Sequence, residues 1–370
     1  QVYGLTEFIY PKHSSIKIYK AHSKDPDDRT IEIAKRIIPF YKAAKKEFEK
    51  VASKAYAPSK LWERQIKNNF KFLHDAIADN NINNVAFFLN NSLSWRDTYL
   101  GCTFSGLHNR NYTILKKLYL RKYIYGHALQ LWSYFNSLNT DYTELDHPRS
   151  GNPDGAYINE TFITPYTFFH AANSKILANF LDDFSRPIVM DLGSGYGLFQ
   201  HYISEFYNKN ICQIFLDIPE ILIIAAYFYL YSHGDDVKVM LYGEKNNPWN
   251  CFEQFDACFL PSSCLNKFED YSVTLLTNTN SLGEMKPSSA KSYLKQIFRI
   301  TSYFFHRNHD IYPRDLGDSE GLLAKQYPVN SSHKLLWRYP CIFQNLHESN
   351  QKIQFEVDTF LYFYGPRHLD

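Results

Sequence analysis

The chain has 370 residues, of which 45% are hydrophobic and 21% are charged. This length suggests about two domains, and the composition is that of a globular protein, which excludes wholesale disorder and collagen-like or coiled-coil chains. The 40 Lys and Arg residues nearly balance the 38 Asp and Glu residues, so no charge excess points to a nucleic-acid partner or to an anionic membrane surface.

The first part of the chain places apolar residues at helical spacing. Helices are predicted over 29–55, with a kink at Pro39, over 61–79 and over 114–138. We therefore expect a mostly helical N-terminal region over 1–150 that covers the ligand site, shapes an acceptor pocket or forms a homodimer interface. The segment 146–155 (DHPRSGNPDG) is rich in turn residues and predicts a boundary or an exposed hinge before a second domain over 151–370.

Beyond this segment, short apolar runs alternate with helical stretches, a pattern that predicts βαβ units and a mainly parallel sheet. Strands are predicted over 188–192, 211–216, 237–241, 256–260, 273–277 and 302–306, and in the C-terminal runs LLWRYP, KIQFEV and FLYFYG. Helices are predicted to begin near Gly197, Pro219 and Pro287. The longest apolar run, 221–231, has 11 residues. A membrane-spanning helix needs ~20 residues, so we expect a buried helix and no transmembrane segment.

The cysteines and the first residues of the sequence bear on the cellular compartment. None of the six cysteines forms a CxxC pair, and a chain of this size folds without disulfides, so reduced thiols are expected. The first stretch lacks the order of regions that is typical of a signal peptide. We therefore expect a cytoplasmic protein without a metal centre.

The sharpest motif is 187–199, PIVMDLGSGYGLF, in which an apolar strand and Asp191 precede Gly193, Gly195 and Gly197. A glycine loop between a first strand and its helix lets a ligand approach the backbone, because a Cβ atom would collide with the ligand. A dinucleotide site has the spacing GxGxxG, whereas this loop has GxGxG. A carboxylate beside the loop would repel a pyrophosphate and attract a cation. A cationic ligand is therefore predicted, with a nicotinamide-type site as the alternative.

A second acid, Asp217, ends the next predicted strand, at the edge where a ribose diol is usually bound. Together with the glycine loop and Asp191, it resembles the class I S-adenosylmethionine-dependent methyltransferases. The resemblance implies a Rossmann-like α/β fold with S-adenosyl-L-methionine as cofactor, whose ribose hydroxyls Asp217 would hold. It further implies cofactor contacts from Tyr196 in the loop and from an adenine-facing edge at Leu260 and Pro261.

The stretch 273–285, VTLLTNTNSLGEM, resembles the NTxSxxEM segment of a family of sugar O-methyltransferases. Further similar segments are LDIPEIL (216–222), FLPSS (259–263) and LLWRYP (335–340), so that the resemblance covers about 157–340. It implies transfer of a methyl group to a sugar hydroxyl. His306 and His309 depart from the family pattern.

A sugar hydroxyl is a weak nucleophile, so a general base is expected at the carboxyl edge of the sheet. Glu284 is the first candidate because it follows a strand by a short loop, and capping of the next helix is its alternative role. His306, after the following strand, is the second candidate.

Polar residues near these candidates are predicted to bind ligands. Asn278 is expected at the methionine end of the cofactor and Asn280 at sugar hydroxyls, with a turn at the strand end as the alternative. His170 and His201 are predicted to contact the substrate, and a structural hydrogen bond is the alternative for each.

Three interpretations of function stay open. The first is an S-adenosylmethionine-dependent O-methyltransferase that acts on a sugar or glycan acceptor, in a polysaccharide precursor or a glycosylated metabolite. The second is an O-methyltransferase of a non-sugar small molecule. The third is a catalytically silent cofactor-binding domain that serves as an interaction module.

Overall fold

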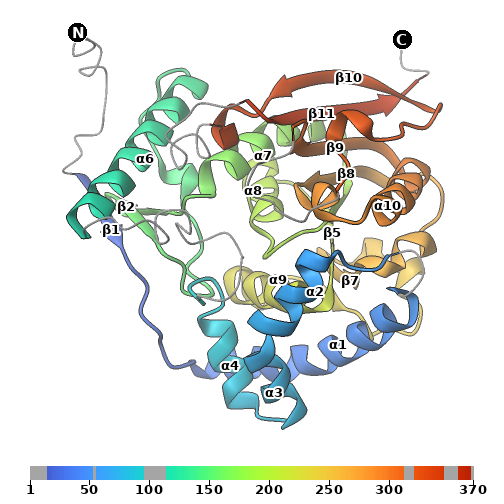
Figure 1. Cartoon of the computed structure of the whole chain (residues 1–370), viewed down its shortest axis with the longest axis horizontal. Coiled ribbons are helices and arrows are strands. Elements are labelled where there is room, and N and C mark those ends of the chain that lie inside the picture. Colours follow the sequence, from blue (N-terminus) through green and yellow to red (C-terminus); the bar gives the residue numbers. More distant parts are fainter. Residues whose placement is uncertain (1–14, 53–55, 96–113, 312–320, 346–356, 368–370) are drawn as a thin grey trace.

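The computed structural model describes residues 15–52, 56–95, 114–311, 321–345 and 357–367. Within these ranges, one sheet contains eight strands in the order β10-β11-β9-β8-β4-β5-β7-β6 (Figure 1). Their bounds are β4 Ile188–Leu192, β5 Cys212–Asp217, β6 Val239–Leu241, β7 Ala257–Pro261, β8 Val273–Thr279, β9 Thr301–His309, β10 His333–Pro340 and β11 Thr359–Pro366. Each strand expected between 188 and 306 is found, and so are the runs LLWRYP and FLYFYG. The run KIQFEV lies largely outside the described residues.

The sheet is mainly parallel. The strands from β6 to β9 in spatial order all pair in parallel, and β11 pairs antiparallel with both β9 and β10. The central strands are buried on both faces, which explains why they are almost wholly apolar. Parallel strands place their carboxyl ends at one edge, so the segments that follow β4, β5 and β8 meet there.

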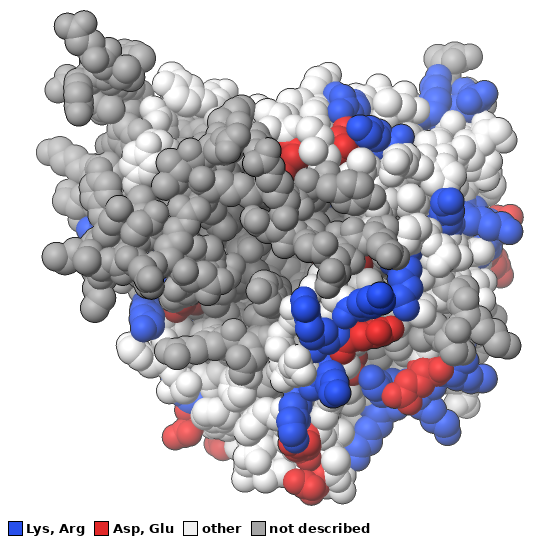
Figure 2. All heavy atoms as spheres, viewed as in Figure 1, with Lys and Arg blue, Asp and Glu red and all other residues white. Residues whose placement is uncertain are grey.

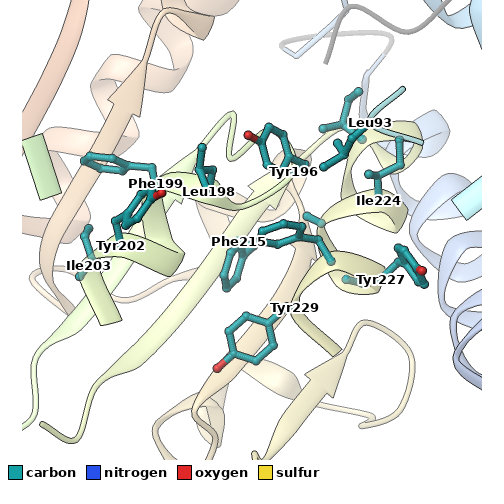
Figure 3. Close-up of a cluster of buried hydrophobic side chains, with 14 of the residues drawn as sticks. Leu93, Tyr196, Leu198, Phe199, Tyr202, Ile203, Phe215, Ile224, Tyr227 and Tyr229 are labelled. Carbon is teal, nitrogen blue, oxygen red and sulfur yellow. The ribbon is translucent and has the colours of Figure 1, made fainter. Parts of the chain in front are cut away.

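Alternate residues of these strands pack against opposite layers of helices. On one face, Phe215 of β5 belongs to a core that includes α7 (Thr167–Leu181), α8 (Leu198–Tyr207) and α9 (Pro219–His233). Figure 3 shows aromatic side chains of this core, among them Phe199, Tyr202 and Phe215. On the other face, Ile214 belongs to a core that includes α10 (Pro287–Ile300). The predicted fold class is therefore confirmed as a Rossmann-like α/β domain with a mainly parallel sheet.

The N-terminal region is mostly helical, as expected. Its helices are α1 Asp28–Ala52, α2 Lys60–Asn69, α3 Lys71–Ala78, α4 Ile82–Asn90 and α6 Ile114–Phe135. The single helix predicted over 61–79 is divided at Phe70, where two asparagines of low helix propensity end α2. A short strand, β1 (Ile16–Tyr19), pairs antiparallel with β2 (Gly155–Ile158), which in turn pairs with β3 (Thr161–Ile163).

A buried carboxylate fastens the N-terminal helices to the sheet domain. Glu220, in the first turn of α9, is fully buried. Its Oε1 atom accepts hydrogen bonds from Lys45 Nζ at 2.7 Å and from Tyr41 OH at 3.2 Å, and it lies 3.2 Å from His74 Nε2. Two helices of the N-terminal region therefore meet at one side chain of the sheet domain.

The segment 146–155 is not the exposed hinge that its composition predicted. Residues 150–155 are buried. Asn152 Nδ2 donates to the carbonyl of His22 at 2.7 Å, and Asp154 Oδ1 accepts from the amide of Ala21 at 2.7 Å. Asn152 and Asp154, polar residues of the kind that suggested a solvated loop, thus form hydrogen bonds with the segment that follows β1.

The longest apolar run lies in α9, which is buried from Pro219 to Leu230, as predicted. Within the described ranges, no helix combines the length and the apolar character needed to span a membrane.

Candidate active site

The glycine loop joins β4 to α8 and adopts backbone angles that favour glycine, with φ of +74° at Gly193 and +56° at Gly195. A Cβ atom at Gly193 would lie 2.1 Å from Ser281 Oγ, so this glycine permits close packing of the loop that follows β8. A Cβ atom at Gly195 would meet no atom within 4 Å. Gly195 therefore faces open space, where a ligand can approach its backbone.

Asp217, at the carboxyl end of β5, lies against this loop. Its Oδ2 atom accepts the amide hydrogen of Gly195 at 2.9 Å, and its Oδ1 atom accepts the amide hydrogen of Ile218 at 2.7 Å. Burial and the nearby carboxylates of Asp191 and Glu284 raise the pKa of Asp217 to about 7. Burial is the main cause, so this pKa marks a carboxyl group held in a poorly solvated place beside the loop.

Asp191 lies beneath the loop, in the interior of β4, and is fully buried. Its Oδ1 atom accepts a hydrogen bond from Thr277 Oγ1 at 2.8 Å, whereas its buried Oδ2 atom has no partner among the described residues. Burial raises the pKa of Asp191 to about 7. Asp191, predicted to bind the cofactor, therefore supports the loop from below and does not line the cavity that opens over the loop.

A cavity of about 880 Å³ opens over the loop. It brings together seven of the predicted site residues, namely His170, Gly193, Gly195, Tyr196, Asp217, Asn280 and Glu284. These residues come from α7, the glycine loop, the end of β5 and the segment after β8. These seven residues therefore line one cavity at the carboxyl edge of the sheet.

Four of the other predicted residues lie close to the cavity without lining it. A Cβ atom at Gly197 would lie 3.1 Å from Phe215, so this glycine serves packing. Leu260 and Pro261 belong to β7, and the next residue, Ser262, reaches the cavity. Asn278 donates to the carbonyl of Leu192 at 2.7 Å and thereby ties β8 to β4. Its Oδ1 atom also accepts the amide hydrogen of Leu282 at 3.4 Å, a contact within the turn that was stated as its alternative role.

Two predicted histidines lie elsewhere, and both assignments are corrected. His306 is fully buried and stacks on Tyr362 with ring centroids 4.6 Å apart, and burial lowers its pKa to about 3. Alternation along β9 turns its neighbour Arg307 to the cavity instead. His201 lies on α8 and lines a second cavity of about 710 Å³. The sequence thus placed His306 near the right strand end but not on the right face, and it placed His201 on the right helix but in the wrong cavity.

Glu284 lies in the short 3-10 helix η6 (Ser281–Glu284). Its Oε2 atom accepts a hydrogen bond from Trp62 Nε1 at 3.0 Å. Burial raises the pKa of Glu284, and the bond from Trp62 and the charge of His309 offset part of this rise. The N-cap residue of α10 is Lys286, so Glu284 contacts the indole of α2 and does not occupy the capping position.

The structure adds site residues that sequence reasoning missed. Trp62 reaches the cavity from α2, Arg307 from β9 and Ser194 from the glycine loop. Ser194 is 6% exposed, and its buried Oγ atom has no partner among the described residues. A tryptophan in the largely polar helix KLWERQIKNN was the available signal for a contact from α2.

His170 is enclosed by the cavity wall, and burial lowers its pKa well below the usual value. The nearby Arg307 acts in the same direction. His170 is therefore neutral at physiological pH, which makes it a weak proton acceptor. In the part of the chain that the structure describes, no three His, Cys, Asp or Glu side chains are grouped to hold a metal ion.

No known family model matches the chain, and no curated protein matches it. Among solved structures, the chain is similar to the mitomycin 7-O-methyltransferase MmcR, with 11% identity, a TM-score of 0.35 and 53% of each chain covered, which is about half the length of that enzyme. It is also similar to a SAM-dependent methyltransferase from Aquifex aeolicus, with 13% identity, a TM-score of 0.29, 51% of this chain and 97% of that chain. A third is the plantazolicin methyltransferase BpumL in complex with SAH, with 11% identity, a TM-score of 0.32, 55% of this chain and 85% of that chain.

Proposed function

We propose that this chain is an S-adenosylmethionine-dependent O-methyltransferase that transfers a methyl group to a sugar hydroxyl. The observation that carries the proposal is the contact between Asp217 and the amide of Gly195, at the floor of a cavity of about 880 Å³. A carboxylate fixed beside an open glycine loop, at the end of the second parallel strand, suits a nucleoside with free ribose hydroxyls.

The residues present fit this cofactor. A ligand in the cavity would lie over Gly195, in the space that a Cβ atom at this position would enter. It would also lie beside the hydroxyl of Ser194, which has no hydrogen-bond partner among the described residues. The carboxylates of Asp217 and Glu284 complement the positive sulfonium and ammonium groups. Arg307, 3% exposed and lining the same cavity, is the matching cation for the carboxylate of the cofactor.

The cofactor, when bound, supplies a methyl group that its sulfonium already activates. The protein then has to align the acceptor hydroxyl with that methyl group. Glu284 accepts the proton of the attacking hydroxyl, and its pKa, raised by burial, makes it a stronger base than a solvated glutamate. Trp62 binds one carboxylate oxygen of Glu284, which fixes the side chain and leaves the other oxygen for the acceptor.

The walls of the cavity favour a sugar among the hydroxyl-bearing acceptors. Tyr56, Trp62, Tyr166, Tyr196 and Tyr293 all line it. Aromatic rings provide flat apolar faces for the C–H side of a sugar ring, and Tyr and Trp side chains add polar groups for its hydroxyls. This combination supports a carbohydrate over a wholly apolar acceptor.

Titration calorimetry with S-adenosylmethionine and S-adenosylhomocysteine tests the first half of the proposal, and methyl transfer to a panel of free sugars, nucleotide sugars and polyphenols tests the second half. The proposal requires binding of both cofactor forms and turnover on a carbohydrate. Turnover on polyphenols alone would support the non-sugar alternative. Binding without turnover on any acceptor would support a silent interaction module, and failure to bind either cofactor form would refute the whole proposal.

A further inference from the structure

Acidic and basic side chains line different parts of the cavity. Asp217 and Glu284 are supplied by the sheet domain, next to the glycine loop. Lys60 and Arg64 are supplied by α2, and both are exposed side chains that line the cavity. Figure 2 shows Lys and Arg side chains gathered over the part of this face where α2 lies. The entrance of the cavity is therefore positive, whereas its floor is negative.

The two cations act as a pair. Residues four apart in a helix lie on the same face, so Lys60 and Arg64 are neighbours there. Trp62 lies between them in sequence, about 3 Å along the helix axis from each. Residues two apart lie about 200° apart around the helix axis, so the pair does not share the face of Trp62. Lys60 and Arg64 nevertheless line the same cavity as the proposed base, Glu284.

Neither cation is neutralised by the protein within the described ranges. The one acidic residue of α2, Glu63, pairs with Lys286 at 3.3 Å, whereas no carboxylate lies within 4.0 Å of Lys60 or Arg64. The third cation of α2, Lys67, also has no ion pair within the described ranges, but it does not line the cavity. Two adjacent positive charges at a cavity mouth attract an anionic ligand and raise its rate of association.

The cofactor does not account for this pair. It carries one carboxylate, for which the buried Arg307 in the cavity wall suffices. We propose that the methyl acceptor is an anionic sugar, whose carboxylate or phosphate binds Lys60 and Arg64 while its hydroxyl reaches Glu284. This inference rests on the proposed function and specifies its substrate class.

Calorimetry on the full chain saturated with S-adenosylhomocysteine tests the inference, with glucose, glucuronate, glucose 1-phosphate and UDP-glucose as probes. At least one anionic probe is expected to bind about tenfold tighter than glucose, with an affinity that falls as salt rises. Glucuronate distinguishes a carboxylate acceptor from the two phosphate-bearing probes.

The double variant Lys60→Gln and Arg64→Gln is expected to lose about tenfold in affinity for the anionic probe and to keep its affinity for S-adenosylhomocysteine. Lys67→Gln is the matched control, because Lys67 is an exposed cation of the same helix that does not line the cavity. This control should change neither affinity.

The possible outcomes distinguish a failure of the anionic-acceptor inference from a failure of the methyltransferase proposal. If the protein binds S-adenosylhomocysteine but shows no preference for an anion, or binds none of the probes, the anionic acceptor is refuted and the methyltransferase proposal stands. Equal losses in the double variant and the Lys67 control would also refute a specific role for the pair. If S-adenosylhomocysteine does not bind, both proposals fall together.

Discussion

The indole Nε1 atom of Trp62 donates a hydrogen bond to Oε2 of Glu284 over 3.0 Å, although the two residues are 222 positions apart in the chain. One belongs to the N-terminal helix α2, and the other follows the central strand β8. This contact makes the N-terminal region part of the active-site wall and fixes the orientation of the proposed base.

Trp62→Phe removes the hydrogen bond and keeps an aromatic ring in the wall. A hydrogen bond to the ionised carboxylate lowers the pKa of Glu284, so its loss raises that pKa further. The acid limb of the kcat profile should move to higher pH, and turnover at pH 7 should fall by about three- to tenfold. Trp249→Phe, which alters a tryptophan that does not line the cavity, is the control. An unchanged pH profile would show that Trp62 does not tune Glu284.

Glu284→Gln removes the proposed base and keeps the size and polarity of the side chain. Turnover should fall by about a hundredfold or more, as is typical when a general base is lost. The affinity for S-adenosylhomocysteine should fall much less than turnover, because the base acts on the acceptor, whereas its charge only adds to the negative potential that faces the ammonium group of the cofactor. Single-turnover methylation together with calorimetry measures both quantities. A variant with full turnover would mean that another group takes the proton or that none is needed.

Asp217→Asn tests the ribose site. The pKa of Asp217 is raised to about 7 in the unliganded protein, and the ionised form is the better acceptor for hydroxyl groups. The affinity for S-adenosylhomocysteine should therefore increase as pH rises through 7, and the variant should lose this dependence together with about 1.5 to 3 kcal/mol of binding free energy.

The same variant provides a stability control. A carboxyl group whose folded pKa lies above its unfolded value makes the folded protein less stable as pH rises between those two values. Asp217→Asn removes this effect, so the unliganded variant should be at least as stable as the parent at pH 8. Loss of both cofactor affinity and stability would point to a purely structural aspartate.

Gly193→Ala and Gly195→Ala form a matched pair within the loop. At Gly193 the new methyl group would lie 2.1 Å from Ser281 Oγ, and the free energy of unfolding should fall by about 2 to 5 kcal/mol. At Gly195 nothing lies within 4 Å, so only backbone strain of about 1 to 2 kcal/mol is expected. Because that methyl group projects into the proposed cofactor position, Gly195→Ala should still weaken cofactor binding by tenfold or more, at about 1.4 kcal/mol per factor of ten. Urea unfolding and calorimetry check the two effects.

Glu220→Gln probes the junction between the N-terminal helices and the sheet domain. Burial alone would raise the pKa of Glu220, but His74 and Lys45 lower it below the usual value. A lowered carboxyl pKa contributes stability above the unfolded pKa, and this contribution is lost as pH falls through the folded pKa. At pH 7 the variant should therefore lose about 1.5 to 3 kcal/mol in urea unfolding, with a smaller difference below pH 4. Glu32→Gln, in the exposed pair with Lys35, should cost less than about 1 kcal/mol.

From residue 188 onward, the sequence by itself determined the strands of the large sheet, the helices that begin near Gly197, Pro219 and Pro287, and the loop at Gly193 and Gly195. It did not predict α4, α7 or the strands β1, β2 and β3. Short continuous apolar runs and a glycine loop are local features, and parallel strands necessarily bring their carboxyl ends together. For this reason Asp217 and Glu284, 67 positions apart, could be placed in one site before any contact was known.

Only the tertiary structure decided which side chains face the cavity. His306 and Arg307 are neighbours in β9, and a shift of one position along a strand reverses the face, so the histidine is buried among aromatic rings while the arginine lines the site. The docking of α2, which supplies Lys60 and Trp62, depends on contacts between residues more than 200 positions apart, including Trp62 with Glu284. Local periodicity carries no information about such contacts, because they depend on how complementary surfaces pack after the elements have formed.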